Sequence, residues 1–507
     1  MLQESDCSAL LAALQKVLAG AGDPPLYLAG GAIREWLAAG GSLQPGAAPG
    51  GPASSALIKD LDFTLPAGAV ALARKLAREL DATFVLLDPE HDVARVVWRG
   101  WDLDFAAFRE QSDTIEEDLG RRDFTINAMA LRLNPPGADL WLPTAGQEPG
   151  LPQGRLLDPW GGGKDLRSGL IRAVNSRVFI ADPLRLLRAY RFQAVLGMRL
   201  ESATEALLRQ DLPAIRRVAA ERVRYEMDAI LAAPGGAGAA AAMAAAGLLY
   251  QVLPEMAAGA GLEQPSSHHL DVSGHGIEAL AQLAEVLAAP ARFFPHFHRE
   301  LSAYLHDPAH PDRGQALRWA ALLHDLGKPA VHRRQEQRIT FYNHDRIGAD
   351  LCRGIAWRLR FSRERTRLLQ LLVAHHMWPF HLSNSRLKTG ISPRACLRLV
   401  RAVGDDLPAL FLLALADSLA GRGPGKPPDM EQNLADLYVE IMTVARERIT
   451  PVLQQPPLLN GHDLQKSCGL PPGPLFKRIL ADLEQARVEG IVTNREQALA
   501  WVRQYRP

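Results

Sequence analysis

The chain has 507 residues and a mass of 55.3 kDa, a length that predicts roughly three domains. Apolar residues make up 47% of it, which excludes wholesale disorder. The formal net charge is +1, so the protein is not globally basic, and any nucleic-acid-binding surface must be local.

The four cysteines, Cys7, Cys352, Cys396 and Cys468, are far apart and form no CxxC pair. This spacing fits a reducing compartment and argues against a zinc–thiolate site or a disulfide scaffold. The N-terminal residues are acidic where a signal peptide would be basic, and no stretch approaches the ~18 apolar residues of a membrane span. We therefore expect a cytoplasmic protein without a membrane segment.

The first part of the chain mixes strand and helix patterns. Residues 1–20 have helical spacing, and a short apolar run at 26–28 ends in Gly30-Gly31, where a second helix begins. Residues 40–56 form a low-complexity loop rich in Gly, Pro, Ser and Ala. Alternating polar and apolar residues then predict three strands, with a helix between the first two. These segments are IKDLDFTL (58–65), AVALARKLAREL (69–80), VARVVW (93–98) and WDLDFAAF (101–108).

The rest of the chain has a different pattern. From about residue 176 onward nearly every periodic segment has helical spacing, and we expect no strand there. Stretches rich in Gly, Ala, Pro or Ser at 234–247, 264–267 and 421–429 are typical of joints. The sequence therefore predicts a small α/β head followed by a long all-helical body.

A Gly-Gly pair and an arginine follow the first apolar run. Gly30 and Gly31 let the backbone approach a phosphate without interference from a Cβ atom, and the helix that they open offers unpaired N–H groups to an anion. Arg34, one turn into the helix, adds a fork of donors. On its own, so short a match is also typical of an ordinary strand–turn–helix.

Paired carboxylates stand on the first predicted strand. Asp60 and Asp62 are two residues apart, so their side chains point to the same face, where they repel each other unless a cation lies between them. Mg²⁺ suits this site because it binds one or two carboxylates together with phosphate oxygens and water. Asp104 of the third strand can supply a third carboxylate if the two strands pair, although Asp102 shares its face and the spacing does not decide between them.

The body contains a His-Asp dipeptide on an apolar helix, where an unpaired charge is costly. Further histidines and an aspartate lie on other predicted helices, and together they form a mixed nitrogen and oxygen donor set suited to Mn²⁺, Fe, Ni²⁺ or Mg²⁺. The residues are His275, His324, Asp325, His344, His375, His376 and Asp417. Core histidines hydrogen-bonded to carboxylates in a vestigial domain are the alternative.

Five segments resemble, in the same order, the class II tRNA nucleotidyltransferase and bacterial poly(A) polymerase family, which belongs to the polymerase-β-like nucleotidyltransferases. They span residues 26–230 and are long enough to be highly specific. The segments are GGAIR (30–34), DLD (60–62), RRDFTINAMA (121–130), DPWGGGKDLRSGLIRAV (158–174) and DPLRLLRAYRF (182–192).

The resemblance implies an α+β fold, with a polymerase-β-like head of mixed sheet and helices followed by an all-α neck, an HD-type body and a helical tail. The corresponding domains are 1–165, 166–263, 264–425 and 426–507. The resemblance also implies that Asp60 and Asp62 hold Mg²⁺ and, with Asp104, carry the chemistry. The residues expected to contact the incoming nucleotide are Gly30, Gly31, Arg34, Arg122, Asp182, Arg185, Arg188 and Arg191.

In this family the helix that carries DPLRLLRAYR reads the incoming base without a nucleic acid template. Asp182 and Arg185 would then face the base edge of CTP or ATP, while Arg188 and Arg191 grip the nucleotide. The family usually has a glutamate directly before this aspartate, and this chain has Ala181 instead. The departure bears on nucleotide selection more than on catalysis.

The body pattern resembles the HD phosphohydrolase superfamily, a domain that some bacterial tRNA nucleotidyltransferases carry with cyclic-phosphodiesterase or phosphatase activity. The resemblance implies a site for Mn²⁺, Ni²⁺ or Fe. Its expected ligands are His275, His324, Asp325 and Asp417, with His344 and His375 as further candidates.

The function that these resemblances imply is template-independent addition of CMP and AMP, from CTP and ATP, to the 3′ end of tRNA. Addition of CC only, addition of A only and poly(A) tailing stay open as alternatives, and the sequence does not predict the oligomeric state. An HD phosphohydrolase whose head merely binds RNA, or a non-catalytic RNA-binding protein, would not need the Asp60–Asp62 pair.

Overall fold

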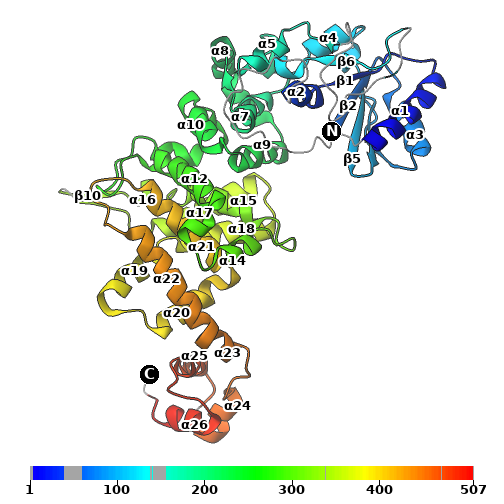
Figure 1. Cartoon of the computed structure of the whole chain (residues 1–507). Coiled ribbons are helices and arrows are strands. Elements are labelled where there is room, and N and C mark those ends of the chain that lie inside the picture. Colours follow the sequence, from blue (N-terminus) through cyan, green and yellow to red (C-terminus); the bar gives the residue numbers. More distant parts are fainter. Residues whose placement is uncertain are drawn as a thin grey trace. The chain divides into compact units, whose positions relative to one another are not determined.

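The computed structural model describes residues 4–38, 60–136, 140, 156–336, 338–469 and 471–505. The loop expected at 40–56 therefore lies outside the described residues. The chain divides into two compact units, shown in Figure 1. The first unit comprises Met1–Gly235 with Ala242–Val252, and the second comprises Gly236–Ala241 with Leu253–Pro507.

A mixed sheet forms the centre of the first unit, and its seven described strands have the order β3-β4-β5-β2-β1-β6-β7. Strands β2 and β5 are parallel, whereas the other neighbours are antiparallel. The strands are β1 (Tyr27–Ala29), β2 (Asp60–Leu65), β3 (Thr83–Asp88), β4 (Val93–Trp98), β5 (Trp101–Ala107), β6 (Ala130–Arg132) and β7 (Leu156–Leu157). The three predicted strands correspond to β2, β4 and β5.

The register of β2 and β5 gives the two faces of the sheet different chemistry. Asp60 lies opposite Asp102, and Asp62 lies opposite Asp104, so all four carboxylates share one face. The alternate residues point to the other face, where Phe63 stacks on a phenylalanine of β5 in the buried core.

Three helices contribute to the same apolar core as these inward residues of β2 and β5. They are α1 (Glu4–Ala19), α2 (Gly31–Ala38) and α3 (Ala69–Glu79). Figure 1 shows α1 and α3 in blue beside the strands. Because the helices cover the apolar face, the carboxylate face stays free to form a cleft.

The remainder of the first unit is mostly helical, and α7 packs against α9. The helices are α4 (Ile115–Gly120), α5 (Gly162–Arg167), α6 (Val178–Ala181), α7 (Arg185–Leu196), α8 (Ser202–Asp211), α9 (Ala220–Ala232) and α11 (Leu248–Val252), and α10 (Gly236–Ala246) spans residues of both units. A short parallel pair, β8 (Leu170–Ile171) and β9 (Arg199–Leu200), lies among them.

The second unit is a helical bundle with a helical tail. In the bundle, α12 packs against α15 and α21, and α18 packs against α15 and α17. The bundle helices are α12 (Val272–Ala288), α13 (Pro290–Phe293), α14 (His298–Leu305), α15 (Arg313–Leu323), α16 (Lys328–Val331), α17 (His344–Arg358), α18 (Arg363–His375), α19 (Trp378–Thr389), α20 (Pro393–Val403), α21 (Leu407–Ala420) and α22 (Met430–Val444). The tail helices are α23 (Thr450–Leu453), α24 (Gly461–Cys468), α25 (Pro474–Val488) and α26 (Arg495–Arg503), and the last three share an apolar cluster.

The predicted fold class, an α+β head followed by helical segments, is confirmed. The expectation of no strand after residue 176 is wrong, because β9 and a small hairpin, β10 (Arg333–Gln335) and β11 (Arg338–Thr340), lie in that region. These strands have only two or three residues, too few for a recognisable alternation of polar and apolar positions. Across the described residues, no helix combines the length and the hydrophobicity needed to cross a bilayer.

Helices α12 and α15 approach closely at Gly276. A Cβ atom added there would lie 2.3 Å from the carbonyl oxygen of Leu322, so only glycine fits. This contact stands one residue from His275 and two residues from His324, and it therefore fixes the distance between the two imidazoles.

We predict that Gly276→Ala destabilises the second unit by about 1–3 kcal/mol, because the added methyl group forces the two helices apart. The control is Gly354→Ala in α17, where a Cβ atom meets nothing within 4 Å. This control should raise stability by about 0.5–1 kcal/mol, since alanine is the better helix former. Calorimetric unfolding of both variants checks the pair, and equal midpoints would contradict the close approach.

Candidate functional site

A cleft of about 830 Å³ opens on the carboxylate face of the sheet in the first unit. All the catalytic and nucleotide-binding residues expected from the sequence line it, and Asp102, the alternative to Asp104, does not. These residues are Gly30, Gly31, Arg34, Asp60, Asp62, Asp104, Arg122, Asp182, Arg185, Arg188 and Arg191. The tertiary structure therefore brings five separate sequence segments to one place.

Asp60, Asp62 and Asp104 all line the floor of the cleft. Burial raises the pKa of Asp62, and neighbouring Asp104 raises it further, whereas Arg122 acts in the opposite direction. Arg95 holds Asp104 with two hydrogen bonds of 2.7 and 2.8 Å. Carboxylate oxygens are the donors that Mg²⁺ prefers, and a bound cation would relieve the mutual repulsion of these acids.

Asp102 also bonds to Arg95, at 2.7 Å, but it does not line the cleft. The structure thus places Asp104, and not Asp102, beside Asp62. Sequence spacing left this choice open because both residues point to the same face of β5. The register of the parallel pair decides it, since Asp104 lies directly opposite Asp62.

The Gly-Gly turn stands against these acids. Gly30 has φ +76°, and a Cβ atom there would lie 3.1 Å from Asp62 Oδ2 and 3.2 Å from Arg122 Nη1. The position therefore needs glycine for its backbone conformation and for its space. Helix α2 begins at the next residue, so that its N-terminus points toward the carboxylate floor and the cleft.

Buried acids hold the cleft arginines in place. Arg122 pairs with Asp118, with 3.2 Å between Nη2 and Oδ2, and its burial lowers its pKa to about 10. Arg188 donates to Asp123 Oδ2 at 2.6 and 2.8 Å. Burial alone would raise the pKa of Asp123, but the guanidinium of Arg188 and a hydrogen bond from Asn127 lower it to about 2. Each of these arginines therefore keeps its position and its charge without a ligand.

Glu226 of α9 closes this network. Its buried carboxylate lies 2.9 Å from Arg191 Nε and 3.9 Å from Arg188 Nη1. The guanidinium groups of Arg34, Arg188 and Arg191 lie 4.9–5.4 Å from the centre of the Phe192 ring, which separates them. The cleft thus concentrates positive charge on one wall, opposite the carboxylate floor.

Asp182 and Arg185 lie at another part of the same wall. Asp182 precedes α7 rather than belonging to it, and it accepts a hydrogen bond from Arg222 Nη2 at 3.1 Å. Arg185 donates to the backbone carbonyl of Arg121 at 2.8 Å, which leaves the guanidinium in the cleft lining. Ala181, where the family has glutamate, is the last residue of α6 and is exposed.

Sequence reasoning missed several residues of this site. Those that line the cleft are Glu35, Arg109, Asp123, Asn127 and Phe192, while Asp118 lies behind it. The i,i+4 spacing of Asp118 and Arg122 was an available signal. The partners of Arg188 and Arg191 come from distant segments, and no local pattern indicates them.

A histidine–aspartate cluster, consisting of His268, His275, His324, Asp325, His344, His376 and Asp417, lies inside the second unit. Asp325 is at its centre. Its Oδ2 atom lies 3.3 Å from His324 Nε2 and 3.7 Å from His275 Nε2, while its Oδ1 atom lies 3.4 Å from His344 Nε2 and 3.7 Å from His376 Nε2. The two oxygens of one carboxylate thus face two different pairs of imidazoles.

Backbone carbonyls orient three of these imidazoles. The Nδ1 atoms of His324, His344 and His376 each lie 2.7–3.0 Å from a carbonyl oxygen three residues earlier. When Nδ1–H donates this bond, Nε2 carries the lone pair that a metal ion needs.

The cluster fits a cation better than it fits a set of hydrogen-bonded core histidines. His324 Nε2 is buried without a hydrogen-bond partner, and the Nε2 atoms of His344 and His376 lie 3.1 Å apart. Two lone pairs at that distance repel each other. Burial alone would raise the pKa of Asp325, yet the ammonium group of Lys328 holds it well below its usual range, so the carboxylate is ionised.

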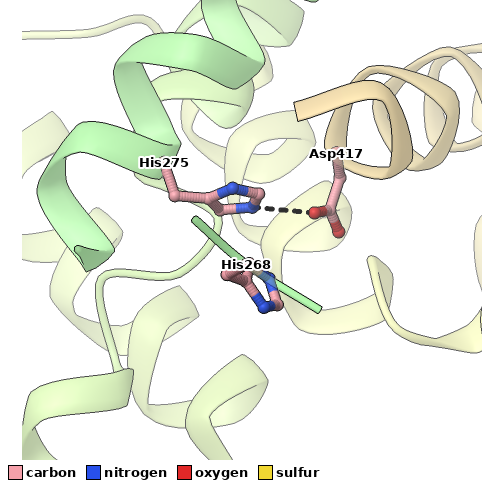
Figure 2. A group of neighbouring side chains, drawn as sticks. All are labelled: His268, His275 and Asp417. Carbon is pink, nitrogen blue, oxygen red and sulfur yellow. Dashed lines mark hydrogen bonds and ion pairs between the residues drawn. The ribbon is translucent and has the colours of Figure 1, made fainter. Parts of the chain in front are cut away.

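The structure places His376, and not His375, in the cluster, because His376 follows α18 and points inward. The ring of His375 instead lies against Trp378, with 5.3 Å between the ring centres. One member, His268, and a lysine beside the cluster escaped the sequence reasoning. Lys328 lies 2.5 Å from Asp325 Oδ2, and His268 lies beside His275 and Asp417, as Figure 2 shows.

Comparisons with known proteins match the head and the body of the chain to two different domain families. Residues 26–172 match the family described as "Poly A polymerase head domain", and residues 280–421 match "HD domain". The A-adding tRNA nucleotidyltransferase of Deinococcus radiodurans is 34% identical over 95% of this chain and 96% of that protein. The CC-adding tRNA nucleotidyltransferase of Thermus thermophilus is 30% identical over 86% of this chain and 87% of that protein.

Solved structures show the same fold. The CCA-adding enzyme of Thermotoga maritima complexed with tRNA has a TM-score of 0.58 at 20% identity, over 99% of this chain and 95% of that one. A CCA-adding enzyme with ATP has a TM-score of 0.61 at 20% identity, with the same coverage. Since the relative from Deinococcus radiodurans is 34% identical and matches over 96% of its own length, the chain belongs to the tRNA nucleotidyltransferase family.

Proposed function

We propose that the chain adds CMP and AMP, from CTP and ATP, to the 3′ end of tRNA without a nucleic acid template. The observation that carries the proposal is the cleft in which Asp60, Asp62 and Asp104 face a wall of arginines. One side provides oxygen ligands for a divalent cation, and the other provides positive charge for a triphosphate. Such a combination serves nucleotidyl transfer rather than RNA binding alone.

The residues divide this work by their chemistry. Asp60 and Asp62 would hold two divalent ions, which would supply charge stabilisation for the attacking and the leaving oxygen of an in-line displacement. Arg34 and Arg122 bind the triphosphate near the Gly-Gly turn, and Arg188 and Arg191 neutralise its remaining charge. Because buried acids already hold Arg122, Arg188 and Arg191, and Asn127 holds Arg34, little reorganisation is needed when the nucleotide arrives.

The base lies toward Asp182 and Arg185 in this proposal. Their carboxylate and guanidinium offer acceptors and donors to a base edge, and Arg222 steadies Asp182.

The incoming RNA follows the outer side of α9 and the turn before it, where Arg216, Arg217 and Tyr225 are exposed. Recognition there rests on the RNA backbone and shape. A cytoplasmic location stays a prediction from the sequence.

Addition of A only is a second candidate. The relative from Deinococcus radiodurans, which matches over 96% of its length, is named an A-adding enzyme. Ala181 also removes the carboxylate that would steady Asp182 from the preceding position. Relatives named CC-adding enzymes match as well, so the product spectrum has to be measured.

We predict that tRNA ending before CCA is extended by three nucleotides when CTP and ATP are both present, and by two with CTP alone. Product ladders on denaturing gels measure this directly. If instead only tRNA that already ends in CC gains a single A, the chain is an A-adding enzyme. A long ladder with ATP alone would indicate poly(A) tailing.

Asp62→Ala should lower the rate of nucleotide addition about a hundredfold or more, because it removes a cation ligand that acts on the reacting phosphate. Asp102→Asn is the matched control, since Asp102 shares the face and the Arg95 contact but does not line the cleft. Its rate should stay within a few-fold of the parent. Equal losses in both variants would contradict the assigned floor of the cleft.

We further propose that the histidine–aspartate cluster binds a transition metal ion such as Mn²⁺, Ni²⁺ or Fe and hydrolyses phosphodiesters or phosphomonoesters. The buried, unpartnered Nε2 of His324 and the short His344–His376 distance support metal binding. A mixed set of imidazole and carboxylate ligands differs from the all-oxygen floor of the head cleft, and it favours a different metal.

For this activity, conversion of 2′,3′-cyclic CMP to a CMP monoester should require Mn²⁺ or Ni²⁺ and should vanish in Asp325→Ala. Substitutions of the two adjacent histidines should have different effects. His376→Ala should lose the activity and His375→Ala should keep it, because only His376 faces Asp325. Chromatography of the products measures both. No conversion by the parent with Mn²⁺, Ni²⁺ or Fe would exclude the hydrolase.

A further inference from the structure

His268 is the one imidazole of the histidine–aspartate cluster that comes from a loop. The loop leads into α12, which carries His275. Potential ligand atoms of His268, His275 and Asp417 all lie within 4.8 Å of one another, and Figure 2 shows the three side chains converging. His275 Nε2 also lies 2.9 Å from Asp417 Oδ1.

The three groups of the cluster share members. His275 belongs both to the group with His268 and Asp417 and to the group with His324 and Asp325. A neutral imidazole has one lone pair available for a metal, so His275 can serve only one ion. Asp417 Oδ1 lies 3.5 Å from His324 Nε2 as well. The five residues therefore surround one ion position, while His344 and His376 face the other oxygen of Asp325.

We propose that His268 is an additional ligand of the ion that His275 and Asp417 hold, supplied by the loop rather than by the bundle. The proposal rests on the metal-binding role of the cluster argued above. The ring of His268 stands edge-on to the ring of His275, with 4.6 Å between the ring centres and 79° between the ring planes. The His275–His324 pair, inside the cluster, has a similar arrangement at 5.2 Å and 71°.

Two backbone hydrogen bonds hold the loop in place. Gly423 N donates to Ser267 O, and Gly425 N donates to Ser266 O, both at 2.9 Å. A Cβ atom on Gly423 would lie 2.2 Å from Ser266 O, so the two segments touch without room for a side chain. The glycine-rich joint at 421–429 begins directly after α21, the helix that carries Asp417, and it thus ties His268 to that ligand.

The ring itself is also oriented. His268 Nδ1 lies 3.0 Å from Ser267 Oγ. When Nδ1–H donates to this hydroxyl, the lone pair stays on the other nitrogen, as it does for the three imidazoles that donate to carbonyls. A ring that merely filled space would need neither the clamped loop nor this bond.

The test uses the full chain with Asp62→Ala, so that the head cleft contributes little to metal binding. In this background His268→Ala should weaken Mn²⁺ binding by about tenfold or more with unchanged stoichiometry, since one of several ligands is lost. It should also change the visible absorption of bound Co²⁺, which reports the ligand set. His269→Ala, the exposed neighbour, should change neither.

His268→Gln keeps much of the side-chain volume and should show the same loss of affinity, with helix content by circular dichroism equal to that of the parent. Parent-like affinity and Co²⁺ absorption in both His268 variants would overturn the inference while leaving the deeper metal site intact. A lower stoichiometry would also overturn it, because His268 would then hold an ion of its own. If the parent and Asp325→Ala bind Mn²⁺ alike, the metal-binding role itself fails.

Discussion

The parallel register of β2 and β5 is the constraint on which the head depends. It sets Asp60 and Asp62 on one strand opposite Asp102 and Asp104 on the next, on one face of the sheet. Four like charges so arranged would destabilise the fold. Arg95 neutralises one side of the group by bonding to both acids of β5. Arg95 does not neutralise the acids of β2, and a bound cation would offset their charge.

The arginines on the opposite wall of the cleft also bring like charges close together. Four guanidinium groups near one another repel. Arg122, Arg188 and Arg191 pair with the buried acids Asp118, Asp123 and Glu226, and Arg34 bonds to the amide of Asn127. Each pair is fixed by a hydrogen bond or a close contact, so the charge is oriented before any ligand enters. The low pKa of Asp123, about 2, reflects how firmly Arg188 is held. This pre-organisation is what a transfer reaction on a triphosphate requires.

The second unit also contains buried charges that must be offset, but different groups surround them. Asp325 and Asp417 are buried carboxylates, and four imidazoles and Lys328 surround Asp325. Neutral imidazoles cannot offset the charge by themselves, but they can bind a metal ion that does. The head floor offers oxygen atoms and the cluster offers nitrogen and oxygen atoms, and these two donor sets favour different metals.

The local sequence was sufficient wherever a motif carries its own chemistry. The Asp60–Asp62 pair, the Gly-Gly turn and the row of arginines are short-range patterns, and all of them line the same cleft. Strand β3 was missed because its residues are largely exposed and do not alternate clearly. Strands β9, β10 and β11 were missed because they are too short to show a period.

The amino-acid sequence by itself determined the family, the order of the segments and most of the charged side chains of the head cleft, because these depend on residue types at fixed spacing. Only the tertiary structure decided between Asp104 and Asp102, between His376 and His375, and whether His268 joins the cluster. Neighbouring residues of one kind look alike in a sequence. Strand register, the end of a helix and the clamping of a loop by a distant glycine determine which of them faces the site, and these arise from contacts between segments far apart along the chain.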